Sequence, residues 1–117
     1  MTGESKGTVE EYERDYGALL RQTREALPSV QLVILEPFVL RPASGAVTDA
    51  WFPEFDQRRA AAARVARAAR ATWVPLHDMF QRLTREAPPE YWLADGVHPT
   101  LPGHAAIARE WLRAVQL

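Results

Sequence analysis

The N-terminal part of the chain carries a helical pattern of hydrophobic positions. Across residues 8–27, apolar side chains recur at three- and four-residue steps, and polar residues occupy most positions between them. This spacing is typical of an amphipathic helix. Thr8 and Glu11 match a capping box at its start, and Pro28 cannot continue the helix at its end. The pattern therefore predicts one helix over these residues.

Two short apolar segments predict strands. Residues 30–35 are rich in β-branched side chains and lack a strict alternation of apolar and polar positions. This favours a strand that is buried on both faces of a parallel sheet. Residues 72–76 form the second segment. Because Pro75 has no N–H to donate, we expect this second strand at the edge of the sheet.

The remaining periodicity predicts further helices. Residues 54–71 are rich in arginine and alanine and present a face of small side chains, and residues 77–85 form a short helix. Residues 37–53 and 86–100 are expected to be loops, the first of them long and rich in aromatic residues. Thr100 then caps a last helix. Its apolar face consists of Leu101, Ala105, Ala108, Leu112 and Val115.

The predicted order of elements is helix, strand, helix, strand, helix. One crossover between parallel strands with flanking helices describes an α/β layered fold. Sheets average about 5–6 strands, and this sequence provides two. We therefore interpret residues 8–117 as part of a domain, preceded by a polar, flexible tail at residues 1–7. The tail has no hydrophobic signal segment, so the cytoplasm is the default expectation and the localisation is otherwise open.

Composition narrows the possible function classes. The chain has 117 residues, of which 47% are hydrophobic and 25% charged, and this excludes a wholly disordered chain. Its 14 basic and 15 acidic residues leave no positive excess for a nucleic-acid partner. No apolar run reaches the ~18 residues of a membrane span. Because cysteine is absent, disulfides, thiol nucleophiles and cysteine-ligated zinc are excluded.

The densest group of chemically active side chains lies at residues 95–104. Asp95 precedes His98 by three residues, so a curled loop can bring its carboxylate onto the imidazole Nδ1. The carboxylate would fix the tautomer and stabilise the imidazolium, leaving the opposite nitrogen as a general base. Gly96 permits the tight turn, and Pro99 stiffens its exit. The pair amounts to two thirds of a nucleophile–base–orienter triad.

Other interpretations of these residue types are weaker. Asp95, His98 and His104 could be metal ligands, but no metal-binding spacing supports this, and we expect neither a metal nor a cofactor. His77 and Asp78 are better explained by a turn at the end of a strand. Three serines occur without a nucleophile motif: Ser5 in the polar tail, Ser29 before the first strand and Ser44 in the long loop.

The sequence block at 91–104 resembles a known family. Its run Tyr-Trp-Leu-Ala-Asp-Gly-Val-His-Pro-Thr, followed by Gly103-His104 and an amphipathic helix, resembles the last block of the SGNH, or GDSL, hydrolases. The predicted strands resemble the fourth and fifth strands of that family. The resemblance implies a partial flavodoxin-like three-layer α/β/α sandwich. It also implies a carboxylic ester hydrolase with a Ser-His-Asp triad, whose last two members match Asp95 and His98.

The chain departs from the family pattern at the nucleophile. The serine of the Gly-Asp-Ser motif, and the glycine and asparagine that help build the oxyanion hole, belong upstream of residue 8 and are missing. The resemblance therefore implies the C-terminal half of such an enzyme, inactive by itself. We expect it to form a homo-oligomer or to pair with a complementary chain that carries the serine.

The substrate implied by the resemblance is a small ester. Phe38, Trp51 and Trp92 are expected to line its acyl pocket, with packing in the core or in a lid as the alternative for each. A second interpretation of the whole chain stays open, in which it is a non-catalytic fragment of this family or a binding subunit. A serine-bearing block encoded next to this chain would favour the enzyme over the remnant.

Overall fold

The computed structural model describes residues 7–116, which fall into two compact units. Of these described residues, 7–34 and 50–73 form the first unit, and 35–49 and 74–116 form the second. Strands β1 (Val33–Leu35) and β2 (Thr72–Val74) pair side by side. Their register is parallel, because the Thr72 N–H donates to Leu32 O and the Glu36 N–H donates to Val74 O. From the first of these bonds to the second, the residue numbers rise along both strands, as they do in a parallel pair.

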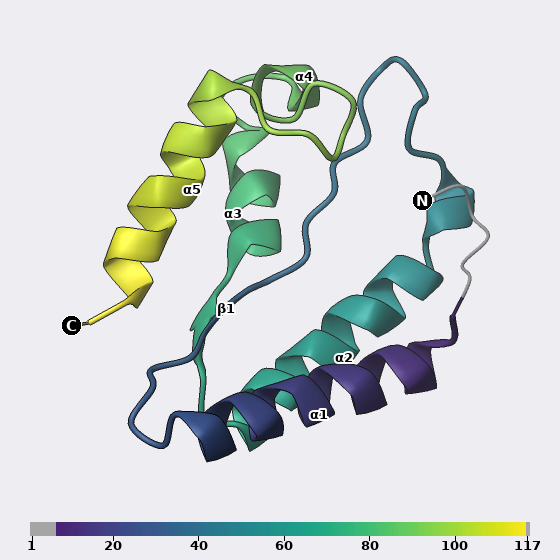
Figure 1. The fold of residues 1–117 in the computed structure, drawn as a ribbon. Coiled ribbons are helices and arrows are strands. Elements are labelled where there is room, and N and C mark those ends of the chain that lie inside the picture. Colours follow the sequence, from purple (N-terminus) through teal and green to yellow (C-terminus); the bar gives the residue numbers. More distant parts are fainter. Residues whose placement is uncertain (1–6, 117) are drawn as a thin grey trace. The chain divides into compact units, whose positions relative to one another are not determined.

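The first unit is built on two long helices, α1 (Val9–Ala26) and α2 (Glu54–Ala68). They lie side by side and run in the same direction (Figure 1). The Glu13 carboxylate, early in α1, meets Arg64 in the second half of α2, and the Arg24 guanidinium donates to Ala69 O where both helices end. The core between the helices and the strands contains Leu20, Ile34, Val65 and Ala66, with Tyr16, Leu32, Ala69, Ala71 and Trp73 packed around them.

The second unit contains three helices and a long irregular segment. The helices are α3 (Leu76–Leu83), α4 (Pro89–Trp92) and α5 (Leu101–Ala114). The irregular segment ends at Asp49, where the 3₁₀ turn η1 (Asp49–Trp51) begins, and the other two residues of η1 belong to the first unit. Helix α3 begins after Pro75, which has no side chain that can cap it. The buried Glu36 carboxylate takes this role and accepts from the His77 N–H at 2.9 Å. The Phe38 ring packs on Phe80, with the ring centroids 5.0 Å apart.

Most predicted elements are present, and their limits differ for local reasons. The capping box of Thr8 and Glu11 is confirmed, because both of its hydrogen bonds form. Both strands are three residues long, shorter than predicted. Residues 86–100 are not entirely loop, since Pro88-Pro89 starts the short helix α4, a position that suits proline. The predicted tail lies outside the described residues except for Gly7.

Helix α5 follows the prediction in its position but not in its orientation. Thr100 caps it as expected, accepting from the Gly103 N–H at 3.2 Å. The leucines of its predicted apolar face point away from the core: Leu101 is 85% exposed and Leu112 is 70% exposed. The helix instead buries Gly103, Ala106 and Glu110. In the described part of the chain, no helix is both long and apolar enough to cross a membrane.

Candidate active site

The loop between α4 and α5 folds back on itself. Leu93 and Pro99 form an isolated antiparallel bridge. Inside it, the Ala94 N–H donates to His98 O at 2.9 Å, and beyond it the Thr100 N–H donates to Trp92 O at 3.0 Å. The five residues 94–98 therefore form a closed turn whose two ends are held together by backbone hydrogen bonds. This turn contains both Asp95 and His98.

Gly96 is required at the tip of this turn. Its φ is +98°, a conformation that side chains with a Cβ rarely adopt. A Cβ built there would also collide with the Leu40 carbonyl and lie 2.7 Å from Val47 Cγ2. The Leu40 N–H donates to Gly96 O at 2.9 Å. The glycine thus lets the irregular segment of the second unit press directly on the turn and hold it.

The Asp95 carboxylate organises the turn through three hydrogen bonds. Its Oδ1 accepts from the backbone N–H groups of Val97 and His98 at 3.0 and 2.9 Å, and its Oδ2 lies 2.6 Å from His98 Nδ1. The Val97 N–H, the His98 side chain and the His98 N–H together hold the pKa of the Asp95 carboxyl well below its ordinary value. The carboxylate is therefore ionised at neutral pH, and it fixes both the backbone and the imidazole.

The geometry assigns the tautomer of His98. An ionised carboxylate only accepts hydrogen bonds, so the Nδ1 facing Asp95 carries the proton and donates it. In neutral imidazole, Nε2 is then the acceptor. The His98 side chain is 79% exposed, and Nε2 has no hydrogen-bond partner among residues 7–116. This nitrogen is thus available to take a proton from a group that approaches from outside.

The turn is anchored to both flanking helices. The Thr100 hydroxyl donates to Tyr91 O at 2.6 Å and accepts from the Gly103 N–H. The Trp92 indole donates from Nε1 to Leu83 O at 3.0 Å, which ties α4 to the end of α3. A side chain on Gly103 would collide with the Trp92 carbonyl. Close packing of α4 and α5 therefore fixes the two ends of the turn that carries Asp95 and His98.

The three aromatic residues predicted to line a substrate pocket have different surroundings. Trp92 is buried, with its indole N–H bonded to the backbone, and Phe38 packs on Phe80. Trp51 is half-buried at the end of η1 and belongs to the first unit. The surroundings of Trp92 and Phe38 explain them as packing residues. A role for these three residues in binding an acyl group stays a prediction.

The other histidines and serines have contacts that differ from those of the Asp95–His98 pair. His77 is buried at the start of α3, and the exposed His104 lies in the first turns of α5. The Ser44 hydroxyl accepts from the Ala46 N–H at 3.4 Å, Ser29 is exposed in a turn, and Ser5 lies outside the described residues. Across residues 7–116, no group of three acidic or histidine side chains is arranged to hold a metal ion.

The sequence interpretation missed the residues that support the turn. The bond from Leu40 to Gly96 comes from a segment more than fifty residues upstream of the turn, and the same segment supplies the buried Glu36 that caps α3. The one signal in the sequence was Gly96 itself, which predicted a tight turn, and glycine also permits the close approach of another backbone segment. It gave no indication of which segment makes that approach.

A family model for GDSL-like lipases and acylhydrolases matches residues 3–106, most of the chain. The chain belongs to the GDSL-like lipase/acylhydrolase family. The match includes the turn with Asp95 and His98 and the beginning of α5. No curated protein is similar enough to this chain to count as a match.

Solved structures of GDSL-like and related hydrolases share the fold of this chain. A candidate GDSL-like lipase from Parabacteroides merdae is 44% identical, with a TM-score of 0.89, over 94% of this chain and 50% of its own. LAE5, an alpha/beta hydrolase enzyme from the metagenome of Lake Arreo, is 27% identical, with a TM-score of 0.78, over 92% and 47%. The acetylxylan esterase Axe2 of Geobacillus stearothermophilus is 23% identical, with a TM-score of 0.73, over 93% and 48%. This family member therefore spans about half the length of the structures it matches.

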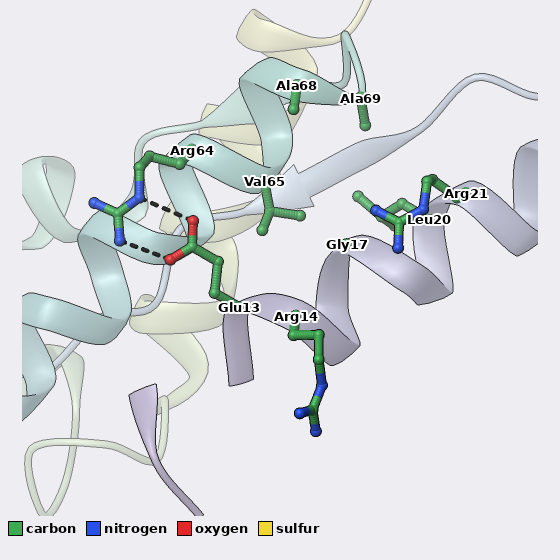
Figure 2. A pocket seen from close by; sticks show the side chains of 9 residues that line it. All are labelled: Glu13, Arg14, Gly17, Leu20, Arg21, Arg64, Val65, Ala68 and Ala69. Carbon is green, nitrogen blue, oxygen red and sulfur yellow. Dashed lines mark hydrogen bonds and ion pairs between the residues drawn. The ribbon is translucent and has the colours of Figure 1, made fainter. Parts of the chain in front are cut away.

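A cavity of ≈ 350 Å³ lies between α1 and α2, entirely within the first unit (Figure 2). The Glu13 carboxylate and the Arg64 guanidinium meet at one end through hydrogen bonds of 2.8 and 2.9 Å. Leu20 and Val65 provide apolar lining. The cavity has neither a histidine nor a hydroxyl side chain in its lining. It therefore lacks the histidine base and the hydroxyl nucleophile of a Ser-His-Asp triad.

Proposed function

We propose that this chain supplies the base and the orienting carboxylate of a Ser-His-Asp triad that hydrolyses carboxylic esters. The observation that carries the proposal is the 2.6 Å contact between Asp95 Oδ2 and His98 Nδ1, with the opposite nitrogen exposed. Membership of the GDSL-like lipase/acylhydrolase family supports the reaction class. The nucleophilic serine would come from the part of a GDSL-like domain that this chain does not span.

In the proposed reaction this chain provides the proton acceptor, His98 Nε2, and the carboxylate that orients it, Asp95. His98 Nε2 would take the proton of the serine hydroxyl as its oxygen attacks the ester carbonyl. The Asp95 carboxylate would stabilise the imidazolium that forms. The imidazolium would return the proton to the leaving alcohol, and an acyl-serine would remain. Nε2 would then take a proton from water as its oxygen attacks the acyl carbonyl. The bond from that carbon to the serine oxygen would break, and the imidazolium would return the proton to the serine. The net products are a carboxylic acid and an alcohol.

Two of the matched structures support the choice of residues. They are described as catalytic mutants of the Geobacillus stearothermophilus acetylxylan esterase, one with an aspartate and the other with a histidine replaced by alanine. The two replaced positions of that enzyme are three apart, the same spacing as between Asp95 and His98. We propose that the pair in this chain has the corresponding roles.

Complementation tests the proposal. The probe is the half of the Parabacteroides merdae protein that this chain does not cover, produced as a separate polypeptide and mixed with this chain. We expect each polypeptide alone to hydrolyse p-nitrophenyl acetate no faster than buffer, and the mixture to be active. Replacing His98→Ala or Asp95→Asn in this chain should lower kcat of the mixture by about 10⁴–10⁶-fold, the range of losses measured when a triad histidine or aspartate is removed.

The matched control is His104→Ala, an exposed histidine six residues further along. With the complementary half at saturating concentration, this variant should leave kcat of the mixture unchanged. Equal rates for the wild-type and His98→Ala mixtures would exclude His98 as the base. Formation of a complex without any activity would instead favour a binding subunit, the second interpretation of this chain.

A further inference from the structure

Helix α5 has a reversed distribution of apolar and charged side chains. At 100° per residue, four apolar positions fall within an arc of about 60° and extend for about 17 Å along the helix. This α5 stripe consists of Leu101, Ala105, Ala108 and Leu112. All four residues are exposed. Single exposed leucines are ordinary on protein surfaces, but a continuous apolar stripe usually marks an interaction site.

The buried face of α5 lies about 160° around the helix from the stripe. Its centre is Glu110, a carboxylate only 6% exposed, which accepts from Arg113 at 2.6 Å and lies 3.9 Å from Arg82 on α3. Gly103 on the same face packs under the Trp92 carbonyl. A rotation of α5 that buried the leucines would expose this ion cluster and separate α5 from α4. The second unit itself therefore holds the stripe outward.

We propose that the α5 stripe is the docking surface for the part of a GDSL-like domain that this chain does not span. This rests on the proposed function, because that part is where the serine would lie. The structural match includes 94% of this chain but only 50% of the Parabacteroides merdae structure. The uncovered half of that relative is therefore about as long as this chain. The exposed α5 stripe provides an apolar surface on which such a segment can pack.

The position of the stripe suits this role. It begins at Leu101, three residues after His98, and the two are joined by the Thr100 cap. A segment that packs on the first turns of α5 would therefore be held within one or two turns of the exposed imidazole. Docking would thus both cover the leucines and bring a nucleophile close to its base.

Charge favours this occupant over a second copy of the chain. Arg109 and His104 border the stripe on its two sides. The only acidic residue of α5 is Glu110, which faces inward. Two copies that met through their stripes would bring arginines together without carboxylates to offset them. A neutral or acidic segment meets no such repulsion.

The experiment measures binding of this chain to the labelled, uncovered half of the Parabacteroides merdae protein by fluorescence anisotropy. Leu112→Glu should weaken the complex at least tenfold. The matched control is Leu27→Glu, which changes a leucine that is 57% exposed at the end of α1 and should bind like the wild type. His98→Ala should also bind like the wild type but lose activity, which separates failure of docking from failure of the proposed chemistry.

Three results would overturn the docking proposal. One is equal binding by the wild type and Leu112→Glu, and another is no binding by the wild type. The third is a dimer of the chain alone, measured by light scattering, that Leu112→Glu dissociates, because the occupant would then be a second copy. Circular dichroism checks that Leu112→Glu folds. If it does not, Ala108→Arg tests the same stripe from an exposed position one turn earlier.

Discussion

Helices α1 and α5 have similar amphipathic sequence patterns, but α1 packs its apolar face against a core and α5 exposes its apolar face. Each begins after a threonine whose hydroxyl accepts from a backbone N–H in the first turn, and each carries one apolar face. In α1 that face meets the core of the first unit through Leu20. In α5 the apolar face is exposed, and the opposite face packs on α3 and α4.

The difference teaches what an amphipathic pattern does and does not predict. Periodicity shows that a helix has a side suited to burial. It does not state whether the covering surface belongs to the same polypeptide. For α1 the cover is α2 and the strands. For α5 the described residues provide none, and the inner face is occupied by a glycine contact and an ion cluster instead.

The largest contrast is expected from leucine truncation in α1. Leu20→Ala removes a buried side chain from the core of the first unit and should cost about 2–5 kcal/mol in the free energy of unfolding. Leu19→Ala is the matched control, because the neighbouring leucine is exposed and should change stability by less than about 0.5 kcal/mol. Urea unfolding followed by circular dichroism measures both. Equal effects would mean that α1 does not pack as described.

Two glycines give the next contrast. In α5, Gly103→Ala places a methyl group against the Trp92 carbonyl and should destabilise the chain by about 1–3 kcal/mol. In α1, Gly17→Ala meets only the end of the flexible Arg21 side chain, at 3.4 Å. The better helix propensity of alanine should then stabilise the chain by about 0.5–1 kcal/mol. The opposite signs, read from unfolding midpoints, test the two packing modes directly.

The sequence predicted the local parts of this structure well. Caps, helix periodicity and the Asp95–His98 spacing all depend on neighbours within four residues, and each is found in the structure. The supports that come from distant segments were not predicted. Glu36 caps α3 and Leu40 holds Gly96, and neither pairing leaves a periodic trace in the sequence. The orientation of α5 was missed for the same reason, since Trp92 and Arg82 on other helices set it.

The threonines that cap α1 and α5 allow the same comparison with smaller expected changes in the free energy of unfolding. Thr8→Ala should cost about 1 kcal/mol, because the Glu11 N–H loses its acceptor. Thr100→Ala should cost about 1–2 kcal/mol, since it loses the Gly103 bond and also the bond to the Tyr91 carbonyl. Thr100→Ser keeps the hydroxyl and should recover most of that loss. Equal losses in the two alanine variants would mean that the contact with Tyr91 contributes nothing.

The smallest expected effect is the most informative about α5. Leu112→Ala removes an apolar side chain that is 70% exposed, so the chain alone should lose less than about 0.5 kcal/mol in the free energy of unfolding. Once the complementary segment of a GDSL-like domain is bound, the same change removes apolar area from a buried interface and should weaken the complex severalfold. A loss of several kcal/mol in the chain alone would instead place Leu112 in a core of this polypeptide. The distinction between α1 and α5 would then disappear. Unfolding of the free chain and titration with the segment therefore decide together whether the apolar face of α5 serves this chain or the one that completes it.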